Sequence, residues 1–265
     1  MIFLKLGGSA ITDKNREATA QPEIIQQIAR EVKRACAANP GIELLIGHGS
    51  GSFGHFAAKK FGYGQRNAQA WRAYAETGAA AARLNRIVTD IFLAEGVPVV
   101  SMQPSASAQC REGELIELAI APIRTALAHN LIPMVHGDVA FDETRGMSIA
   151  STEIVFAYLA RLFKPSRIIL AGIVDGVFTA DPLRDSSAQL IREITPQTFP
   201  QIESRLRGSH GVDVTGGMIG KVKKMVELVQ REPAIRVHIV SAMREGVIER
   251  VLAQEDFSEG TIIHA

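Results

Sequence analysis

One stretch constrains this chain more than any other: residues 46–55, which read IGHGSGSFGH. The apolar run at residues 42–46 leads into it and is typical of a short buried strand. Glycine has no Cβ, so the N–H groups of a glycine-rich turn can approach a ligand closely. A helix that begins at the end of the stretch, near His55, adds unpaired N–H donors and the positive end of its dipole. The stretch therefore predicts a cradle for an anion such as phosphate, with an imidazole at its rim.

Apolar runs and helical spacings alternate along the whole chain. We expect strands at residues 2–6, 42–46, 97–100, 132–136, 167–171, 189–194, 237–240 and 261–264. We expect helices at residues 22–36, 67–94, 121–129, 151–163 and 218–230, and a hairpin around residues 143–146. The alternation predicts an α/β fold, an open and mostly parallel sheet with helices on both faces in three αβα layers.

Most of the glycine clusters follow a predicted strand. In an open parallel sheet, ligands bind where the strands end, at their carboxyl edge. We therefore expect the glycine clusters to gather on one edge of the sheet. The break at Lys164 and Pro165 is the expected boundary between two lobes, residues 1–165 and 166–265, of one continuous fold.

The composition excludes several classes of protein. With 46% hydrophobic and 22% charged residues, the chain is neither disordered nor fibrous. A net charge of +1 gives no footprint for nucleic acid. No apolar stretch approaches the roughly 20 residues of a membrane helix, and the apolar run at the start is too short for a signal peptide. Two cysteines, Cys36 and Cys110, are too few for a disulfide framework, so we expect a cytoplasmic protein.

Three lysines stand close to glycine turns. Lys5 lies within an apolar strand that runs into a Gly-Gly turn, where a buried ammonium needs an anionic partner. It either points at a bound phosphate or sits on an edge strand and reaches solvent, and the glycines favour the phosphate. Lys14 is an ordinary loop lysine unless the same turn brings it close. Lys221 follows the glycine-rich residues 208–217 at a helix start, without the G-K-[ST] order of a Walker A motif.

The glycine stretch also matches the dinucleotide-binding fingerprint G-x-G-x-x-G at residues 49–54, with Glu76 at a suitable distance. That fingerprint normally opens the first βαβ unit, whereas a full unit precedes it here. It also leaves the histidines of the stretch without a role. His55, at the mouth of the cradle, can donate to a phosphate oxygen. His48 and His136 are expected to be structural.

Taken together, the motifs resemble the amino acid kinase superfamily. The resemblance rests on residues 5–9, Lys14, residues 48–55, 136–138, 175–182 and 213–221. The histidine that ends the second glycine loop resembles that of the isopentenyl phosphate kinases in this superfamily. The resemblance implies an amino-terminal substrate-binding lobe, a carboxy-terminal ATP-binding lobe and a homodimer. It also implies that ATP, with Mg²⁺, phosphorylates isopentenyl phosphate to isopentenyl diphosphate, an isoprenoid precursor.

The resemblance further implies roles for individual residues. The catalytic side chains would be Lys5 and Lys14, which stabilise the transferring phosphoryl group, and His55, which holds the substrate phosphate. ATP would contact Lys5, Gly7, Gly8, Ser9, Gly51, Asp175, Thr179, Gly216 and Lys221. The substrate would contact Ser50, Gly54, His55, Ser151 and Thr152. No side chain is implied as a metal ligand, because the ATP phosphates carry most of the Mg²⁺ coordination.

Two positions depart from the pattern of many relatives. Ser50 stands in place of a glycine, and Ser151-Thr152-Glu153 stands in place of Ser-Gly-Asp. The N–H group survives at the first position, whereas the contacts made at the second are open.

The acceptor in this reaction has an ionised phosphate at one end and a hydrocarbon at the other. An ionised phosphate needs alignment and convergent positive charge rather than a general base. For the hydrocarbon, one helix face and a nearby ring form either a pocket or ordinary core: Trp71, Tyr74, Ala75, Gly78 and Phe53. The alternatives are a related kinase such as fosfomycin kinase, and a non-enzymatic nucleotide- or dinucleotide-binding protein.

Overall fold

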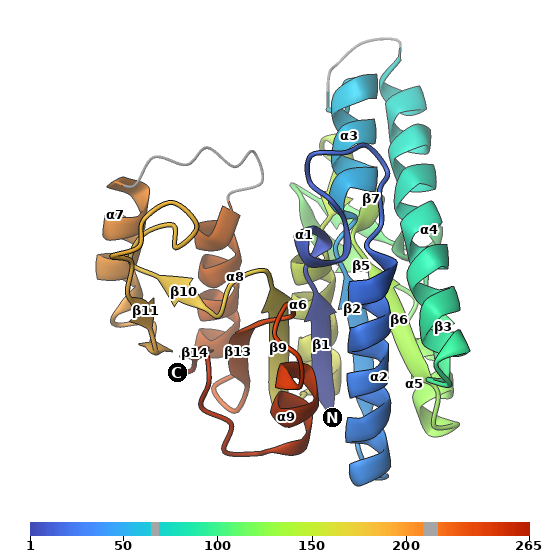
Figure 1. The fold of residues 1–265 in the computed structure, drawn as a ribbon. Coiled ribbons are helices and arrows are strands. Elements are labelled where there is room, and N and C mark those ends of the chain that lie inside the picture. Colours follow the sequence, from blue (N-terminus) through green and yellow to red (C-terminus); the bar gives the residue numbers. More distant parts are fainter. Residues whose placement is uncertain (65–68, 209–216) are drawn as a thin grey trace.

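The computed structural model describes residues 1–64, 69–208 and 217–265 (Figure 1). Its main feature is an eight-stranded sheet in the order β12-β14-β13-β9-β1-β2-β6-β3. In chain order these strands are β1 Ile2–Leu6, β2 Leu44–His48, β3 Val99–Ser101, β6 Ile132–His136, β9 Arg167–Gly172, β12 Glu193–Ile194, β13 Arg236–Ser241 and β14 Thr261–Ile263. Neighbouring strands run parallel except for β13 and β14. The predicted open, mostly parallel sheet is confirmed.

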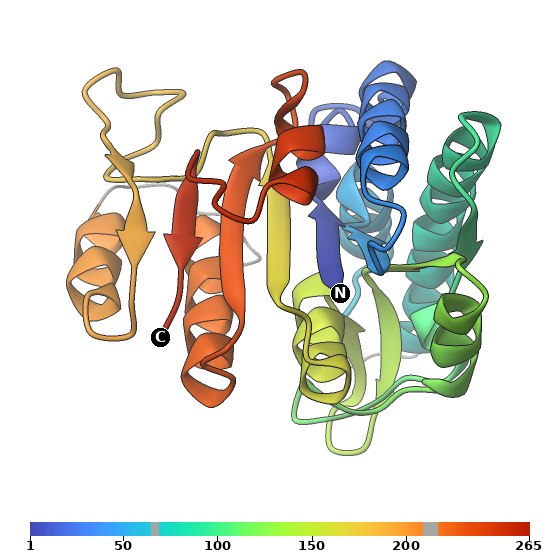
Figure 2. The same ribbon diagram turned by 90° about the horizontal axis from the view of Figure 1, so that it is seen from below.

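Helices cover both faces of this sheet, as Figure 2 shows. On one face lie α2 Pro22–Ala38, α3 Gly51–Phe61, α4 Ala70–Ala94 and α9 Val247–Ala253. On the other face lie α5 Ala121–Ala128, α6 Thr152–Phe163, α7 Phe199–Gly208 and α8 Gly217–Arg231. Leu4 and Leu6 belong to the core cluster of the first face and Phe3 to that of the second. Because side chains alternate along a strand, Lys5 points with Phe3 toward the face that carries α6 and α8.

The central strand β1 marks the point where the strand order reverses. It pairs with β2 on one side and with β9 on the other, over five residues in each case. The turns that follow β1, β2 and β9 therefore meet at one edge of the sheet. A crevice for a ligand is expected at such a switch point.

Two smaller sheets are attached to the main one. The first has the order β5-β4-β7-β8, with β4 Gln109–Arg111, β5 Glu114–Glu117, β7 Asp138–Asp142 and β8 Gly146–Ala150. The second pairs β10 Val177–Phe178 with β11 Leu190–Ile191. The antiparallel β7–β8 pair confirms the predicted hairpin. The sequence did not predict β4 or β5, because strands of three or four residues leave little periodic pattern.

Several boundaries differ from the expected ones for physical reasons. β2 runs on through Gly47 and His48, because both residues pair with β1 and with β6. The helix expected near His55 begins earlier, at Gly51. The strand expected at residues 189–194 is divided between β11 and β12, which belong to different sheets. The expected start of the long helix lies outside the described residues, and α4 begins at Ala70. Among the described residues, no helix combines the length and apolar character needed to cross a membrane.

Candidate active site

The turns after β1 and β2 touch each other backbone to backbone. A Cβ on Gly8 would lie 2.5 Å from the Gly51 nitrogen, and a Cβ on Gly49 would lie 2.9 Å from the Gly8 nitrogen. Gly51 also has a φ of +50°, in the left-handed region that favours glycine. A larger residue at any of these positions would push the turns apart. The glycines predicted to form two phosphate-binding turns therefore form one continuous backbone surface.

Thr12 fastens this contact from the side. Its Oγ1 donates to the carbonyl of Gly8 at 2.7 Å and accepts the N–H of Ser52 at 2.9 Å. The buried side chain thus links the short helix α1, Gly8–Ile11, to the first turn of α3. Ser9 lies in α1 and is half-buried. Sequence reasoning missed Thr12, because a single threonine after a glycine turn belongs to no recognised motif.

Two helix N-termini converge over Gly137, the residue between β6 and β7. A Cβ on Gly137 would lie 3.7 Å from the nitrogen of Ser50 and 3.6 Å from the nitrogen of Thr152. Ser50 is the N-cap of α3, and Thr152 is the first residue of α6. Helix N-termini carry unpaired N–H donors and the positive ends of dipoles, so this geometry suits an anion. The structure thus brings together residues from two of the predicted substrate-binding segments.

The hydroxyl groups at this place are engaged within the protein. Thr152 Oγ1 donates to the carbonyl of His48 at 2.7 Å, and Ser151 Oγ accepts the N–H of Ile154 at 3.3 Å as an N-cap. Gly54 packs under Ser50, since a Cβ on Gly54 would lie 2.3 Å from Ser50 Oγ. An anion at the cradle would therefore meet backbone N–H groups rather than the hydroxyl of Thr152.

Lys5 is buried in the centre of the sheet and forms an ion pair. Its Nζ lies 3.2 Å from Oε1 of Glu153, and both side chains are less than one-tenth exposed. Burial would raise the pKa of Glu153, but the charges of Lys5 and Lys221 outweigh it and hold that pKa below its ordinary value. Glu153 is thus a carboxylate that interacts with two ammonium groups, one from β1 and one from α8. The alternative of an edge-strand lysine is wrong, because β1 lies between β2 and β9.

Lys14 and His55 are predicted catalytic residues that the structure leaves exposed. Lys14 lies in the loop between α1 and α2, and His55 lies on α3, about one helical turn after Gly51. The side chain of His55 is therefore accessible to a ligand rather than sealed in the interior.

Two buried histidines are the last residues of β2 and β6, the strands that lead into the cradle. His48 and His136 are fully buried, and their rings stack with centroids 5.5 Å apart. Burial lowers the pKa of His48 to about 3 and that of His136 to about 4. Nε2 of His48 lies 3.0 Å from the Asn85 side-chain nitrogen, and Nδ1 lies 3.1 Å from the Gly49 carbonyl oxygen. The expectation that both histidines are structural agrees with this burial, whereas Asn85 was not foreseen.

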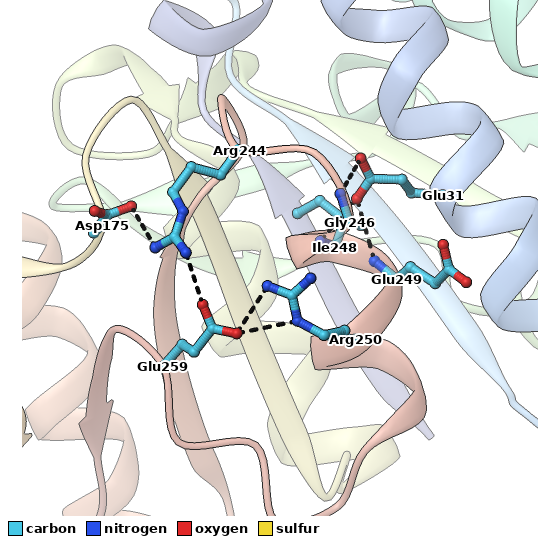
Figure 3. Close-up of polar contacts among 8 residues, drawn as sticks. All are labelled: Glu31, Asp175, Arg244, Gly246, Ile248, Glu249, Arg250 and Glu259. Carbon is cyan, nitrogen blue, oxygen red and sulfur yellow. Dashed lines mark hydrogen bonds and ion pairs between the residues drawn. The ribbon is translucent and has the colours of Figure 1, made fainter.

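The residues expected to meet ATP from the second half of the chain lie on separate elements. Asp175 follows β9, and its Oδ1 lies 3.4 Å from Nη1 of Arg244 (Figure 3). Thr179 follows β10, and its Oγ1 accepts the N–H of Gln189 at 3.0 Å. Lys221 lies in the first turns of α8 and interacts with Glu153. Gly216 lies outside the described residues.

Only some of the five residues considered for a hydrocarbon pocket lie together in the structure. Tyr74 stacks on Phe141 of β7 with ring centroids 4.9 Å apart, and Trp71 lies 6.1 Å from each of these rings. Gly78 lets α4 approach β7, since a Cβ there would lie 2.9 Å from Val139 Cγ2. Ala75 is exposed and Phe53 lies in the core. Phe141 was missed, because its position opposite α4 follows only from the tertiary fold.

Comparison with known proteins agrees with the fold. Residues 1–241 match the profile of the amino acid kinase family. The chain belongs to the amino acid kinase family, which confirms the resemblance drawn from its motifs.

Within this family, the chain is similar to isopentenyl phosphate kinases. The isopentenyl phosphate kinase of Methanothermobacter thermautotrophicus is 36% identical, over 97% of this chain and 96% of that protein. The one from Methanocaldococcus jannaschii is 33% identical, over 84% of this chain and 85% of that protein. A solved isopentenyl phosphate kinase structure superposes with a TM-score of 0.83 at 34% identity and covers 99% of both chains.

Proposed function

We propose that this protein transfers the γ-phosphoryl group of ATP to isopentenyl phosphate, giving isopentenyl diphosphate and ADP. Its similarity to isopentenyl phosphate kinases over nearly the whole chain supports the choice of substrate. The structural observation that carries the proposal is the buried Glu153 carboxylate, which lies 3.2 Å from Nζ of Lys5 and whose pKa is lowered by the charges of Lys5 and Lys221. Glu153 directly follows Thr152, whose nitrogen would lie 3.6 Å from a Cβ on Gly137.

The reaction has to bring two anionic phosphates end to end. Two like unit charges about 4 Å apart repel by about 4 kcal/mol at an effective dielectric constant near 20. In this proposal Lys5 and Lys221 offset that repulsion, because their ammonium groups turn toward the equatorial oxygens of the transferring group. Glu153 holds both ammonium groups in place before the ligands arrive. Lys14 adds a further charge from its exposed loop.

The acceptor phosphate is proposed to lie in the cradle over Gly137. The N–H groups of Ser50 and Thr152 and the dipoles of α3 and α6 hold it, while His55 donates from the rim. The acceptor oxygen is already ionised, so the site has to align it for in-line attack rather than remove a proton. The glycine turns at residues 7–9 and Gly51 are proposed to contact the phosphates of ATP.

Magnesium belongs to the proposal as a partner of the nucleotide. In the described ranges, no three His, Cys, Asp or Glu side chains are grouped so that they could hold a metal ion. The side chains proposed for the site are mainly cationic, which fits a Mg²⁺ ion that the ATP phosphates bring with them. When bound, the ion would neutralise charge on the nucleotide phosphates.

The organisation of the molecule is part of the same proposal. Residues 1–165 form the acceptor-binding lobe, and residues 166–265 form the ATP-binding lobe. We propose that the protein acts as a homodimer in the cytoplasm, in the synthesis of isoprenoid precursors. Multi-angle light scattering of the purified protein tests the homodimer directly.

A ligand screen tests the proposed activity against its alternatives. Thermal shift with ATP–Mg²⁺, NAD, isopentenyl phosphate and fosfomycin, each alone, is followed by a coupled assay for ADP release. We expect stabilisation by ATP–Mg²⁺ and by isopentenyl phosphate, and ADP release only when both are present. ADP release from ATP with fosfomycin as the acceptor, but not with isopentenyl phosphate, would indicate the related kinase. Stabilisation by NAD alone would remove the kinase proposal.

Replacing His55 by Ala tests the acceptor site. Loss of a donor to the reacting phosphate should lower kcat/KM for isopentenyl phosphate by about 10²-fold or more, with ATP binding nearly unchanged. The matched control is His129→Ala, which removes an exposed histidine at the end of α5 and should leave turnover at the wild-type level. Wild-type turnover in His55→Ala would contradict the role given to His55.

A further inference from the structure

One guanidinium joins three segments on the proposed ATP-binding side. Arg244 lies in the loop after β13, and its Nη1 lies 3.4 Å from Oδ1 of Asp175 in the turn after β9. Its Nη2 lies 3.2 Å from Oε2 of Glu259, just before β14 (Figure 3). The strands β9, β13 and β14 are neighbours in the sheet. The planar fork of arginine suits such a bridge between two carboxylates, whereas the point charge of lysine does not.

A buried carboxylate from the first half of the chain fixes the loop that carries Arg244. Glu31 of α2 is fully buried and accepts the N–H groups of Gly246, Ile248 and Glu249 at 2.9, 2.9 and 3.3 Å. These N–H groups belong to the start of α9, so Glu31 caps this helix and complements its dipole (Figure 3). Gly246 is only two residues beyond Arg244.

A buried side chain also holds the carboxy-terminal end of α9. Arg167 of β9 donates to the carbonyl oxygens of Val251, Leu252 and Gln254, at 2.8, 3.2 and 2.5 Å. A carboxylate at one end and a guanidinium at the other therefore hold α9 against α2 and the sheet. The Arg244 loop therefore leads into a helix that is held at both ends.

We infer that Arg244 is a positioning residue for nucleotide binding and that Glu31 acts through it. Arg244 holds the Asp175 turn in the conformation that meets ATP, and Glu31 sets the loop from which Arg244 reaches that turn. The inference rests on the proposed function, in which Asp175 faces ATP. The inference connects α2, in the proposed acceptor lobe, with the turn that is proposed to receive the nucleotide.

The primary test compares two arginines that share one partner. Arg244→Ala should raise KM for ATP about three- to fivefold, as expected for a half-exposed ion pair, and leave KM for the acceptor unchanged. Arg250 contacts the same Glu259 through Nη2 at 2.8 Å, and in Figure 3 its dashed lines run to Glu259 and none runs to Asp175. Arg250→Ala should therefore leave KM for ATP at the wild-type value. Equal increases in the two variants would overturn the inference, because the effect would then come from Glu259.

Coupling measurements separate positioning from general loss of structure. Arg244→Ala should have no further effect on KM for ATP once Asp175→Asn is present, because the two residues act as a pair. Glu31→Gln removes one carboxylate oxygen from the cap of α9 and should raise KM for ATP. In the double variant with Arg244→Ala, the increase should be smaller than the two single effects combined. Fully additive effects, or a parallel rise in KM for the acceptor, would overturn the inference.

Direct nucleotide binding distinguishes this inference from the proposed function. ATP–Mg²⁺ binding is measured by calorimetry in the wild type, Arg244→Ala and Arg250→Ala. Weaker binding in Arg244→Ala alone supports the inference even if isopentenyl phosphate proves to be the wrong acceptor. Equal binding in all three variants overturns the inference and leaves the proposed function standing. Absence of ATP binding in the wild type overturns both.

Discussion

A lysine is tolerated in the middle of β1 because a carboxylate from another element accompanies it. Lys5 stood out in the sequence, since an ammonium in an apolar strand requires a partner. Its partner in the structure is Glu153, a residue that had been noted only as a departure from the family pattern. The pair is buried on both sides, so either member left alone would be an uncompensated charge in the interior.

The Glu153→Gln substitution tests this dependence. It keeps the size of the side chain but leaves Lys5 buried without a counter-charge, so we expect unfolding to become easier by about 3 kcal/mol. We also expect kcat to fall, because the two ammonium groups lose their common anchor. Urea denaturation and steady-state kinetics measure the two effects.

An exposed lysine–glutamate pair provides the control for that substitution. Lys164 and Glu232 form an ion pair in which the lysine side chain is 60% exposed. Glu232→Gln should cost less than about 1 kcal/mol and leave kcat unchanged. Equal destabilisation in the two variants would show that burial does not increase the contribution of the Lys5–Glu153 pair to stability.

The sequence draws attention to a residue that is anomalous in its own segment, but it gives no signal for a residue whose contacts depend on a distant partner. His55 and Lys5 were visible because of their immediate neighbours. Arg244 could not be seen, because its partner Asp175 lies 69 positions away. Glu31 could not be seen either, since the N–H groups it caps lie 215 to 218 positions further along the chain.

At the scale of elements, α9 shows how a short helix is held. It has seven residues, too few for a stable isolated helix, and the sequence pattern did not predict it. Glu31 at its start and Arg167 at its end supply hydrogen bonds and charges that complement the helix dipole. Tertiary contacts therefore determine this element, whereas the long helices α2 and α4 were predicted from signals within their own segments.

Arg167→Met should destabilise the protein by about 3 kcal/mol, because buried carbonyl oxygens at the end of α9 lose a charged donor. The control is Arg236→Met. Arg236 pairs in register with Arg167 on the adjacent strand but is exposed. Its replacement should change stability by less than about 0.5 kcal/mol. Chemical denaturation measures both variants, and equal effects would contradict the capping role of Arg167.

At the scale of the whole molecule, three buried histidines make stability depend on pH. Burial lowers the pKa of His48 to about 3 and the pKa values of His136 and His238 to about 4. In the unfolded chain each pKa returns to about 6.5, so the unfolded state binds protons that the folded state excludes. This contribution to stability is complete above about pH 6.5 and is lost as the pH falls toward 4.

We expect each of these histidines to lower the free energy of unfolding by about 1.4 kcal/mol when the pH falls from 7.5 to 5.5, or by about 4 kcal/mol together. Urea denaturation at the two pH values measures the loss. In His238→Leu the loss should be smaller by about 1.4 kcal/mol, whatever the variant's stability at pH 7.5. The pKa of Glu153 is held below its ordinary value of 4.5, so its titration falls outside this window. An identical pH slope in the variant would refute the assignment for His238.

The sheet and its helical layers were predictable because each long element carries its own periodic pattern and the alternation limits the topology. The small sheets β5-β4-β7-β8 and β10-β11 were less predictable, because pairings rather than patterns define them. For the site, the glycine turns and their position at strand ends could be read from the sequence. The convergence of two helix N-termini over Gly137 required the fold.

The pairing of β1 with β9 has a consequence for how the two halves can move. It forms an unbroken seam of five registered residues between the proposed lobes. A hinge motion that separated the two halves would break the hydrogen bonds between β1 and β9 and expose the buried middle of the sheet. Any closing motion around ligands must therefore arise from a change in sheet twist and from loops at the rim, and substrates must enter and leave along that rim.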